Sequence, residues 1–263
     1  MSLDAPIAHG RSAEIHPWKD GQILKLFHDW LPTEAVQHEA RIARAVHAAG
    51  LAAPRAGEIV EVGGRLGLEY ERLDGMPMGK EMAARPWSLA RLSRLLAKLH
   101  VEMHAVEGMD GLPPQRARLE TKIRRAGGLD PGLQAAVLRA LDRMPEGDRL
   151  CHNDFHPWNV MMTGRGAVVI DWTDAACGNP LADVARTALV LGGVRHMTEM
   201  VTWKEKLAAG LCCRAYLRRT FELRPGSEFE YRAWWPIVAA ARMDEEISGL
   251  EEWLRAQVEK GVR

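Results

Sequence analysis

Cysteine is scarce in this chain, and its spacing excludes the usual cysteine-based sites. The only cysteines are Cys151, Cys177, Cys212 and Cys213. They do not form the two closely spaced pairs of a structural zinc site, and the adjacent pair suits no ordinary disulfide framework. We therefore predict reduced thiols in a cytoplasmic protein.

The chain also lacks an excess of charge of either sign and any long apolar run. Its 35 basic and 35 acidic residues cancel, which gives no electrostatic basis for binding nucleic acid or an anionic membrane. No stretch offers the roughly 20 apolar residues of a membrane span, and the amino-terminal residues do not resemble a signal peptide. We expect a soluble monomer or homodimer whose partner is a small molecule, more easily a neutral or cationic one.

The stretch from Leu150 to Trp172 contains the strongest chemical pattern. His152-x-Asp154 is followed by Asn159 and then by an apolar hairpin that ends at Asp171. Two carboxylates and an amide supply hard oxygen ligands for Mg²⁺ and an acceptor for a hydroxyl proton. A turn rich in Asn and Asp is the alternative, but it explains neither the spacing nor the second aspartate.

At these residues the chain resembles the aminoglycoside phosphotransferase family, the small-molecule branch of the protein-kinase-like fold that includes choline and fructosamine kinases. The matching residues are His152, Asp154, His156, Pro157, Asn159 and Ile170-Asp171-Trp172. The resemblance implies an α+β, two-lobed fold. Residues 1–73 would form an N-lobe with a small antiparallel sheet and one helix, and residues 74–263 a larger, mainly helical C-lobe.

Turn signals and alternating apolar residues predict the sheet of the N-lobe. Residues 7–27 read as strands with turns at Gly10 and at Lys19-Asp20-Gly21, because Asp-Gly favours hairpins. Residues 58–61 and 65–72 form a second hairpin around Gly63-Gly64. Apolar spacing predicts a helix from Pro32-Thr33 to Gly50.

The resemblance implies a nucleotide site for ATP, with GTP as the alternative. The family's third-strand lysine falls on Lys25, which alternation places on the same strand face as Ile23 and Phe27. The helix glutamate that pairs with it falls on Glu39. Glu34 competes, but the helix dipole explains an acid in the first turn. The alternative for Lys25 is an edge-strand lysine that deters aggregation. The alternative for Glu39 is a solvated glutamate on the helix surface.

Other expected nucleotide contacts use the backbone. Gly10, Ser12 and Ala13 occupy the position of the family's phosphate-covering loop, and their small size permits close approach to phosphate. An ordinary hairpin turn is the alternative. Glu71 and Leu73 fall at the hinge, where main-chain groups meet the adenine edge.

Leucine and methionine spacing predicts the helices of the C-lobe. They cover residues 89–106, 115–126 and 133–144, then a helix that opens at Asn179-Pro180, and further helices from residue 196 with breaks near residues 225 and 243. His100 and His104 share one helix side, a geometry that can bind zinc, but no third ligand has a plausible place in the sequence.

The resemblance also assigns the chemical roles. Asp154 is the catalytic base, and Asn159 and Asp171 are the Mg²⁺ ligands. Asp183 braces the catalytic loop through backbone hydrogen bonds, and His152 packs behind that loop as structural support.

The acceptor site is the least defined part of the sequence. The C-terminal helices line it in the family, which makes Glu230, Trp234 and Asp244 candidate contacts for an amine-bearing substrate. A solvated helix face or a core position is the alternative for each. Trp158 and Asn153 stand where many relatives have glycine, and Thr173 where many have an acid. Trp158 is therefore a further candidate contact.

These observations predict an ATP- and Mg²⁺-dependent phosphotransferase that acts on a hydroxyl of a small molecule such as an aminoglycoside or another antibiotic. A kinase for choline, a sugar or an amino sugar would share every chemical residue. A protein kinase is disfavoured because no Ala-Pro-Glu follows Asp171. A catalytically silent nucleotide-binding protein is the alternative from a different class.

Overall fold

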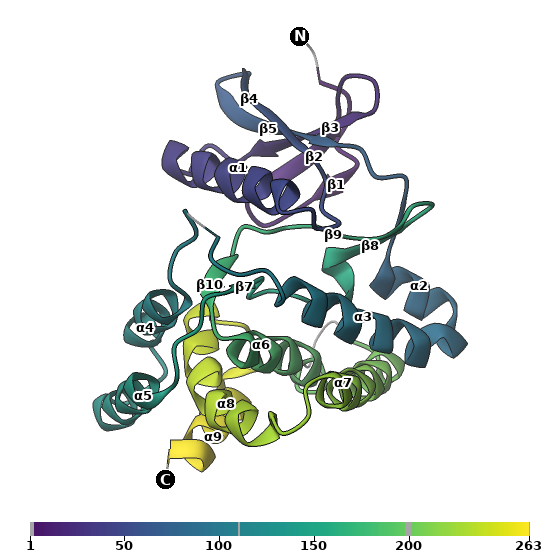
Figure 1. Cartoon of the computed structure of the whole chain (residues 1–263). Coiled ribbons are helices and arrows are strands. Elements are labelled where there is room, and N and C mark those ends of the chain that lie inside the picture. The colour runs from purple at the N-terminus through teal and green to yellow at the C-terminus, as the bar shows by residue number, and fades with distance from the viewer. Residues whose placement is uncertain (1–2, 110, 198–200, 263) are drawn as a thin grey trace. The chain divides into compact units, whose positions relative to one another are not determined.

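The chain folds into two compact units with different secondary structure (Figure 1). A computed structural model describes residues 3–109, 111–197 and 201–262. The first unit comprises Met1–Pro77 and Asn159–Thr173, and the second comprises Met78–Trp158 and Asp174–Arg263. The first holds an antiparallel sheet and the second is mainly helical, so the predicted α+β class is confirmed.

A five-stranded antiparallel sheet forms the centre of the first unit. Its strands are β1 (Ala8–His9), β2 (Ala13–Pro17), β3 (Gln22–Phe27), β4 (Ala56–Val62) and β5 (Arg65–Glu71), in the order β1-β2-β3-β5-β4. Gly21 has a φ of 69° in the β2–β3 turn, a left-handed value that favours glycine. The two hairpins predicted from the sequence are therefore present.

Helix α1 (Thr33–Ala48) packs on this sheet through its apolar side. Val36 and Ala40 of the helix join Ala13, Phe27 and Leu68 of the sheet in one buried cluster. Residues three and four apart share a helix face. The same buried side therefore includes position 39 and brings a carboxylate to the sheet.

A second, three-stranded sheet belongs to the same unit. Its strands β6 (Gly75–Pro77), β8 (Val160–Thr163) and β9 (Gly166–Val169) lie in the order β6-β8-β9. Val160 pairs with Val169, and the Ile170 amide then donates to the Asn159 carbonyl at 2.9 Å. This register places Asn159 and Asp171 at the same open end of the β8–β9 hairpin.

The second unit contains the helices expected from the sequence, together with one short helix, α2, that the sequence did not predict. They are α2 (Met78–Ala84), α3 (Leu89–Met103), α4 (Gln115–Arg125), α5 (Pro131–Arg143), α6 (Pro180–Gly193), α7 (Trp203–Leu223), α8 (Glu228–Arg242) and α9 (Glu251–Val262). Strands β7 (Arg149–Cys151) and β10 (Ala176–Gly178) pair antiparallel. Over the described part of the chain, no helix combines the length and apolarity that a membrane crossing requires.

Helix α6 begins as its sequence predicts. The Asn179 side chain accepts a hydrogen bond from the Leu181 amide at 2.9 Å, and Pro180 occupies the first helical position. Asp183 lies in the first turn, and Arg186 follows three residues later. Both side chains therefore point to the same side of the helix.

Candidate active site

Lys25 of β3 lies among carboxylate oxygens in the first unit. Its Nζ donates to Oε1 of Glu39 at 2.7 Å and lies 3.4 Å from Oδ1 of Asp171. Burial opposes the charge on the amine, but the two carboxylates outweigh it and raise the pKa of Lys25 above its ordinary value. The amine is therefore charged at neutral pH, as phosphate binding requires.

Glu39, and not Glu34, is the glutamate that pairs with this lysine. Glu39 is 3% exposed, whereas Glu34 is exposed in the first turn of α1. Its Oε1 also accepts from the Tyr70 hydroxyl at 3.0 Å. Burial and the neighbouring Glu39 raise the pKa of Tyr70 well above its ordinary value, which keeps this hydroxyl a donor. Glu39 therefore has a fixed position from which it orients the lysine.

Thr173 links this cluster to the expected metal-binding aspartate. Its Oγ1 lies 3.0 Å from Oε2 of Glu39 and 2.9 Å from Oδ1 of Asp171, so its single hydrogen serves one carboxylate at a time. The φ of Asp171 is 60°, which non-glycine residues rarely adopt. Such backbone strain is concentrated at functional sites.

Asn159 and Asp171 fit a magnesium ion by the chemistry of their donor atoms. Amide and carboxylate oxygens are hard ligands, and Mg²⁺ usually takes only one or two carboxylates together with waters and substrate phosphates. The backbone hydrogen bond between Ile170 and Asn159 fixes one donor at the hairpin end. The Asp171 side chain is 49% exposed, which leaves access for the remaining ligands.

The expected phosphate-covering loop is a tight turn between β1 and β2. The Gly10 amide donates to the Ala13 carbonyl at 2.8 Å, and the Ser12 carbonyl accepts from the His28 amide at 3.0 Å. The Ala13 side chain lies in the buried cluster with Phe27. The part of this turn that meets phosphate would therefore be its backbone, and that contact stays a prediction.

The expected hinge residues follow the last long strand of the same sheet. Glu71 ends β5, where its amide donates to the Arg55 carbonyl at 2.9 Å and its carboxylate pairs with Arg165 at 2.7 Å. Leu73 is half-buried two residues later. Their contact with an adenine edge stays a prediction.

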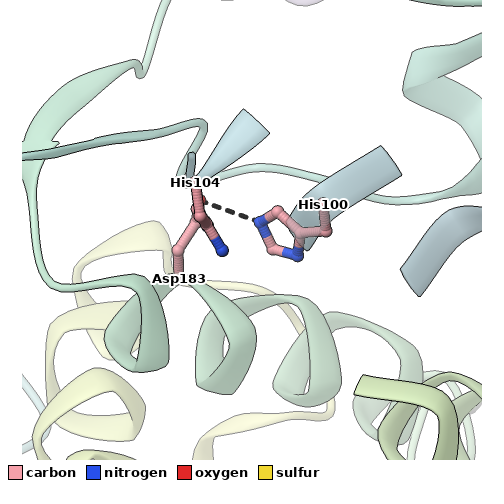
Figure 2. A group of neighbouring side chains, drawn as sticks. All are labelled: His100, His104 and Asp183. Carbon is pink, nitrogen blue, oxygen red and sulfur yellow. Dashed lines mark hydrogen bonds and ion pairs between the residues drawn. The ribbon is translucent and has the colours of Figure 1, made fainter. Parts of the chain in front are cut away.

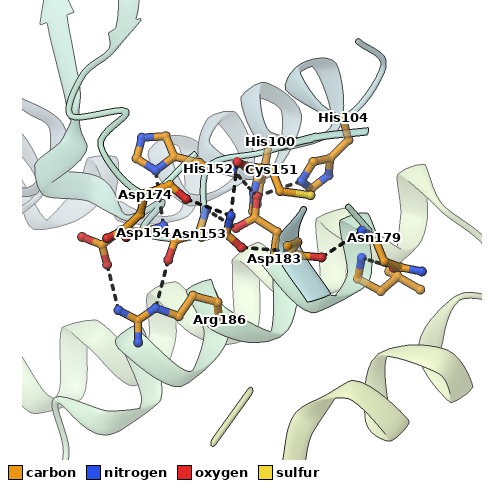
Figure 3. Close-up of polar contacts among 12 residues, drawn as sticks. His100, His104, Cys151, His152, Asn153, Asp154, Asp174, Asn179, Asp183 and Arg186 are labelled. Atoms are coloured by element: carbon orange, nitrogen blue, oxygen red, sulfur yellow. Dashed lines mark hydrogen bonds and ion pairs between the residues drawn. The ribbon is translucent and has the colours of Figure 1, made fainter. Parts of the chain in front are cut away.

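Asp154, in the second unit, is held between a guanidinium and an imidazole. Its Oδ1 accepts from Nη2 of Arg186 at 3.1 Å (Figure 3), and its Oδ2 lies 3.5 Å from Nε2 of His156. Burial opposes ionisation, but His156, Arg186 and His152 outweigh it and lower the pKa of Asp154 well below its ordinary value. Asp154 is therefore an anion at neutral pH, ready to accept a hydrogen bond from a hydroxyl.

Arg186 was not predicted from the sequence. Its Nε donates to the Asn153 carbonyl at 3.0 Å, and its Nη2 lies 2.8 Å from Glu245 as well as near Asp154. The side chain is only 11% exposed. Its spacing of three from Asp183 on α6 was the available signal, because it puts both residues on the side of the helix that faces the catalytic loop.

Asp183 is the centre of a buried hydrogen-bond network (Figures 2 and 3). Its carboxylate accepts from the amides of His152 at 2.6 Å and Asn153 at 2.8 Å. It also accepts from Nε2 of His100 at 2.9 Å and Nε2 of His104 at 3.2 Å. These are the backbone bonds that a brace of the catalytic loop requires.

Asp183 supplies the third possible metal ligand beside His100 and His104, which the sequence did not reveal. The ligand atoms of His100, His104 and Asp183 lie within 4.8 Å of one another. However, the two ring nitrogens and two backbone amides already donate to Asp183. Burial and the neighbouring His100 lower the pKa of His104 to about 3, so His104 is a neutral donor. The hydrogen bonds account for the cluster without an ion.

Asn153 shows why the catalytic loop tolerates a residue other than glycine here. Its φ of 61° lies in the left-handed region, which asparagine enters more readily than most residues. Its Oδ1 accepts from Gln115 at 2.8 Å, and its Nδ2 donates to the Asp174 carbonyl at 3.1 Å. These contacts offset the backbone cost.

The candidate acceptor contacts have separate partners in the protein. Glu230 accepts from Asn179 at 2.8 Å and from Trp234 at 3.4 Å, and Trp234 is only 2% exposed. Asp244 pairs with Arg125 at 3.3 Å. Trp158 is 58% exposed and packs beside Gly79 of α2. Their contact with an acceptor stays a prediction.

Comparison with known proteins identifies the family. A sequence model of the phosphotransferase enzyme family matches residues 5–222. The chain belongs to this family. The protein is therefore a phosphotransferase, the enzyme class that its sequence predicts. A search of the curated proteins finds no match.

Solved structures with a similar fold include several small-molecule kinases. A thermostable mutant of aminoglycoside phosphotransferase APH(4)-Ia is 18% identical with a TM-score of 0.66, over 100% of this chain and 94% of the other. A choline/ethanolamine kinase family protein from Mesorhizobium loti is 16% identical with a TM-score of 0.60, over 100% and 86%. Amicoumacin kinase is 13% identical with a TM-score of 0.60, over 98% and 87%. This likeness confirms the predicted protein-kinase-like fold of the phosphotransferase.

Proposed function

We propose that this phosphotransferase moves the γ-phosphoryl group of ATP to a hydroxyl of a small molecule. The observation that supports the proposal best is the convergence of Glu39 and Asp171 on the charged amine of Lys25. Binding of nucleotide phosphates requires a lysine that a fixed carboxylate orients and that lies beside an aspartate able to bind metal. Lys25 has both neighbours.

In the proposed reaction the acceptor hydroxyl oxygen bonds to the γ-phosphorus while the bond from that phosphorus to the β–γ bridging oxygen breaks. Asp154 orients the hydroxyl and takes its proton, an effect worth about 10²- to 10⁴-fold in rate. Lys25 neutralises charge on the phosphates, and ADP leaves. Positioning and electrostatics supply most of the remaining acceleration, as expected for a loose transition state.

Asn159 and Asp171 would hold Mg²⁺. When bound, the ion neutralises phosphate charge and fixes the geometry of the phosphoryl group. Gly10, Ser12 and Ala13 would cover the phosphates, and Glu71 and Leu73 would receive the adenine through their main chain. Asp183 and His152 support the loop that presents Asp154.

The acceptor classes that we propose are aminoglycosides and other antibiotics, with choline, sugars and amino sugars as the alternatives. The solved structures with a similar fold described above include an aminoglycoside phosphotransferase, a choline/ethanolamine kinase family protein and amicoumacin kinase. Trp158, Glu230, Trp234 and Asp244 are the residues proposed from the sequence to contact an amine-bearing acceptor. We further propose a cytoplasmic monomer or homodimer with no nucleic acid or membrane partner.

The direct test is acceptor-dependent release of ADP, measured with Mg·ATP and with Mg·GTP over a panel of antibiotics, sugars, amino alcohols and hydroxy acids. With an active acceptor, Asp154→Asn should lower kcat by about 10²- to 10⁴-fold. Asp142→Asn is the matched control, because Asp142 is exposed on α5. Full activity of Asp154→Asn would refute the assignment of the base.

The same assay separates the rival functions. Phosphorylation of generic protein substrates without any small-molecule acceptor would favour a protein kinase. Nucleotide binding without turnover across the panel would favour a silent nucleotide-binding protein.

A further inference from the structure

A small cavity in the second unit is lined by more cations than anions. Its charged lining consists of Arg118, Lys122, Arg186, Arg242, Asp174 and Glu245. The cavity has a volume of about 30 Å³, which is room for one or two water-sized groups. It adjoins the catalytic aspartate, because Arg186 contacts both Glu245 and Asp154.

The two carboxylates of the lining do not balance its cations. Glu245 lies 2.8 Å from Arg186, 3.6 Å from Lys122 and 3.8 Å from Arg242, so three cations share this carboxylate. Arg186 also pairs with Asp154 at 3.1 Å. Asp174 pairs with Arg118. With Asp154 included, four cationic side chains face three acidic ones, and the balance at the cavity is positive although the whole chain is neutral.

Arg242 is the least compensated of these cations. The residue is 7% exposed, and within the described ranges nothing accepts a hydrogen bond from its Nε or Nη1. Its closest carboxylate, Glu245, is at ion-pair distance only. Burial and the neighbouring Arg186 lower the pKa of Arg242 to about 10. Buried guanidinium nitrogens without an acceptor are costly, and such groups in native proteins call for a specific explanation.

We propose that the acceptor carries an anionic group, a carboxylate or a phosphate, which binds Arg242 together with Arg118 or Lys122. This inference rests on the proposed phosphotransfer, but it departs from the acceptor classes named above and assigns a small hydroxylated anion instead. A planar guanidinium suits either oxyanion. Arg186 contacts both Asp154 and Glu245, so the cavity lies close to Asp154. In the acceptor, the hydroxyl that reacts at Asp154 and the anionic group that binds in the cavity are therefore only a few bonds apart.

A polycationic acceptor is disfavoured at this cavity. An amine placed there would face Arg242, Lys122 and Arg118, and like charges at short range repel strongly where burial lowers the dielectric screening. The expectation of a neutral or cationic substrate, drawn from the balanced overall charge, does not take this local excess into account. Local charge, and not net charge, decides which ligand a pocket accepts.

The test is calorimetric binding to the enzyme saturated with Mg²⁺ and AMP-PNP, so that the nucleotide site is filled. The anionic probes are glycerate, gluconate, glycerol 3-phosphate and glucose 6-phosphate. The neutral and cationic counterparts are glycerol, glucose, glucosamine and an aminoglycoside. We expect at least one anion to bind more tightly than its counterparts, and comparison of carboxylates with phosphates identifies the group. Preference for the amines, or no binding by any anion, would overturn the proposal.

Substitutions locate the binding. Arg242→Gln should weaken the preferred anion by about 10- to 100-fold, whereas Arg242→Lys should retain part of the affinity. Arg232→Gln is the matched control, because Arg232 is an exposed arginine on the same helix. With a substrate that turns over, the loss should appear mainly in KM. An unchanged affinity in Arg242→Gln would overturn the assignment of this residue.

The melting temperature of an Arg242 variant distinguishes an anion-binding arginine from a merely structural one. Removing a poorly compensated buried charge should raise the melting temperature of Arg242→Met by about 2–4 °C. A structural role predicts a lower melting temperature and unchanged anion binding, which together would overturn the proposal. Nucleotide turnover with a cationic best acceptor would refute this inference alone. Anion binding that depends on Arg242 but no phosphotransfer would refute the proposed function alone.

Discussion

The guanidinium of Arg186 lies 3.1 Å from Oδ1 of Asp154 and favours the anionic form of this carboxylate. A lowered pKa means that Asp154 stays ionised well into the acidic range. The activity of the wild-type enzyme should therefore not be limited by protonation of Asp154 near its ordinary pKa. The position of the arginine on α6 also limits how far the catalytic loop can move.

Replacing Arg186 with Gln should shift the pH dependence of activity. Without the cation, the pKa of Asp154 rises, so the acidic limb of the kcat/KM profile should move to higher pH. Looser positioning of the loop should lower kcat on the order of 10²-fold. Arg139→Gln, at an exposed position of α5, is the control. An unaltered acidic limb would mean that Arg186 does not act through Asp154.

Replacing Lys25 with Met should impair the use of nucleotide more than folding. The methionine keeps an unbranched apolar side chain but removes the charged amine, which lies between Glu39 and Asp171 and 5.5 Å from the centre of the Phe27 ring. We expect kcat/KM for ATP to fall by about 10²- to 10³-fold, measured at saturating acceptor. Lys260→Met, an exposed position on α9, should behave as wild type. Equal losses in the two variants would point to a non-specific effect.

Replacing Thr173 with Val should weaken the affinity of the enzyme for Mg²⁺. The change keeps the side-chain shape but removes the hydroxyl that lies 2.9 Å from Asp171 and 3.0 Å from Glu39. Partners of metal ligands typically contribute about 10- to 100-fold in metal affinity, so the Mg²⁺ concentration for half-maximal activity should rise. Thr121→Val on α4 is the control. A normal Mg²⁺ requirement in Thr173→Val would contradict this role.

His104 should make the protein less stable in acid. Its folded-state pKa is about 3, against about 6.5 for an unfolded histidine. Between these values the unfolded chain binds a proton that the folded chain excludes. The free energy of unfolding should therefore fall as pH decreases from 6.5 towards 3, by up to about 1.4 kcal/mol per pH unit from this residue.

The variant His104→Gln tests this pH dependence, since glutamine offers a donor to Asp183 but does not titrate in this range. Thermal unfolding followed from pH 7 to pH 4 should show a shallower loss of stability in the variant than in the wild type. His9→Gln, at a side chain 70% exposed, is the control. An identical slope in His104→Gln and wild type would assign the acid sensitivity to other groups.

The parts of the fold that repeat an apolar spacing were predictable from the sequence. Helices α1 and α3 and the hairpins of the first sheet each bury one face. Burial of one face requires apolar residues at the regular spacing of a helix or a strand, and this spacing can be recognised in the sequence. Helix α2 was missed because its seven residues bury only Met78 and Met82, too few for a recognisable period. The β7–β10 pair was missed because it joins distant segments such as Cys151 and Ala176.

The chemical motif was recognisable because several of its residues lie together in the sequence, and the family resemblance added Lys25, Glu39 and Asp183. The motif around Asp154 and Asp171 indicated the chemistry, and the family match supports it. Arg242 gave no such signal, because a single arginine on a helix normally reads as a solvated side chain, and the signal for Arg186 was limited to its spacing of three from Asp183. Only the tertiary neighbours reveal that both are buried, and the excess of positive charge at their cavity depends on that burial.

The discontinuity of the first unit has a practical consequence for protein engineering. A fragment that stops at Pro77 contains Lys25 and Glu39 but lacks Asp171, and its strand β6 loses β8, the strand with which it pairs. An excised first unit would therefore need the segment 159–173 supplied by a designed linker. Exchanging this module between relatives calls for two grafted segments rather than one.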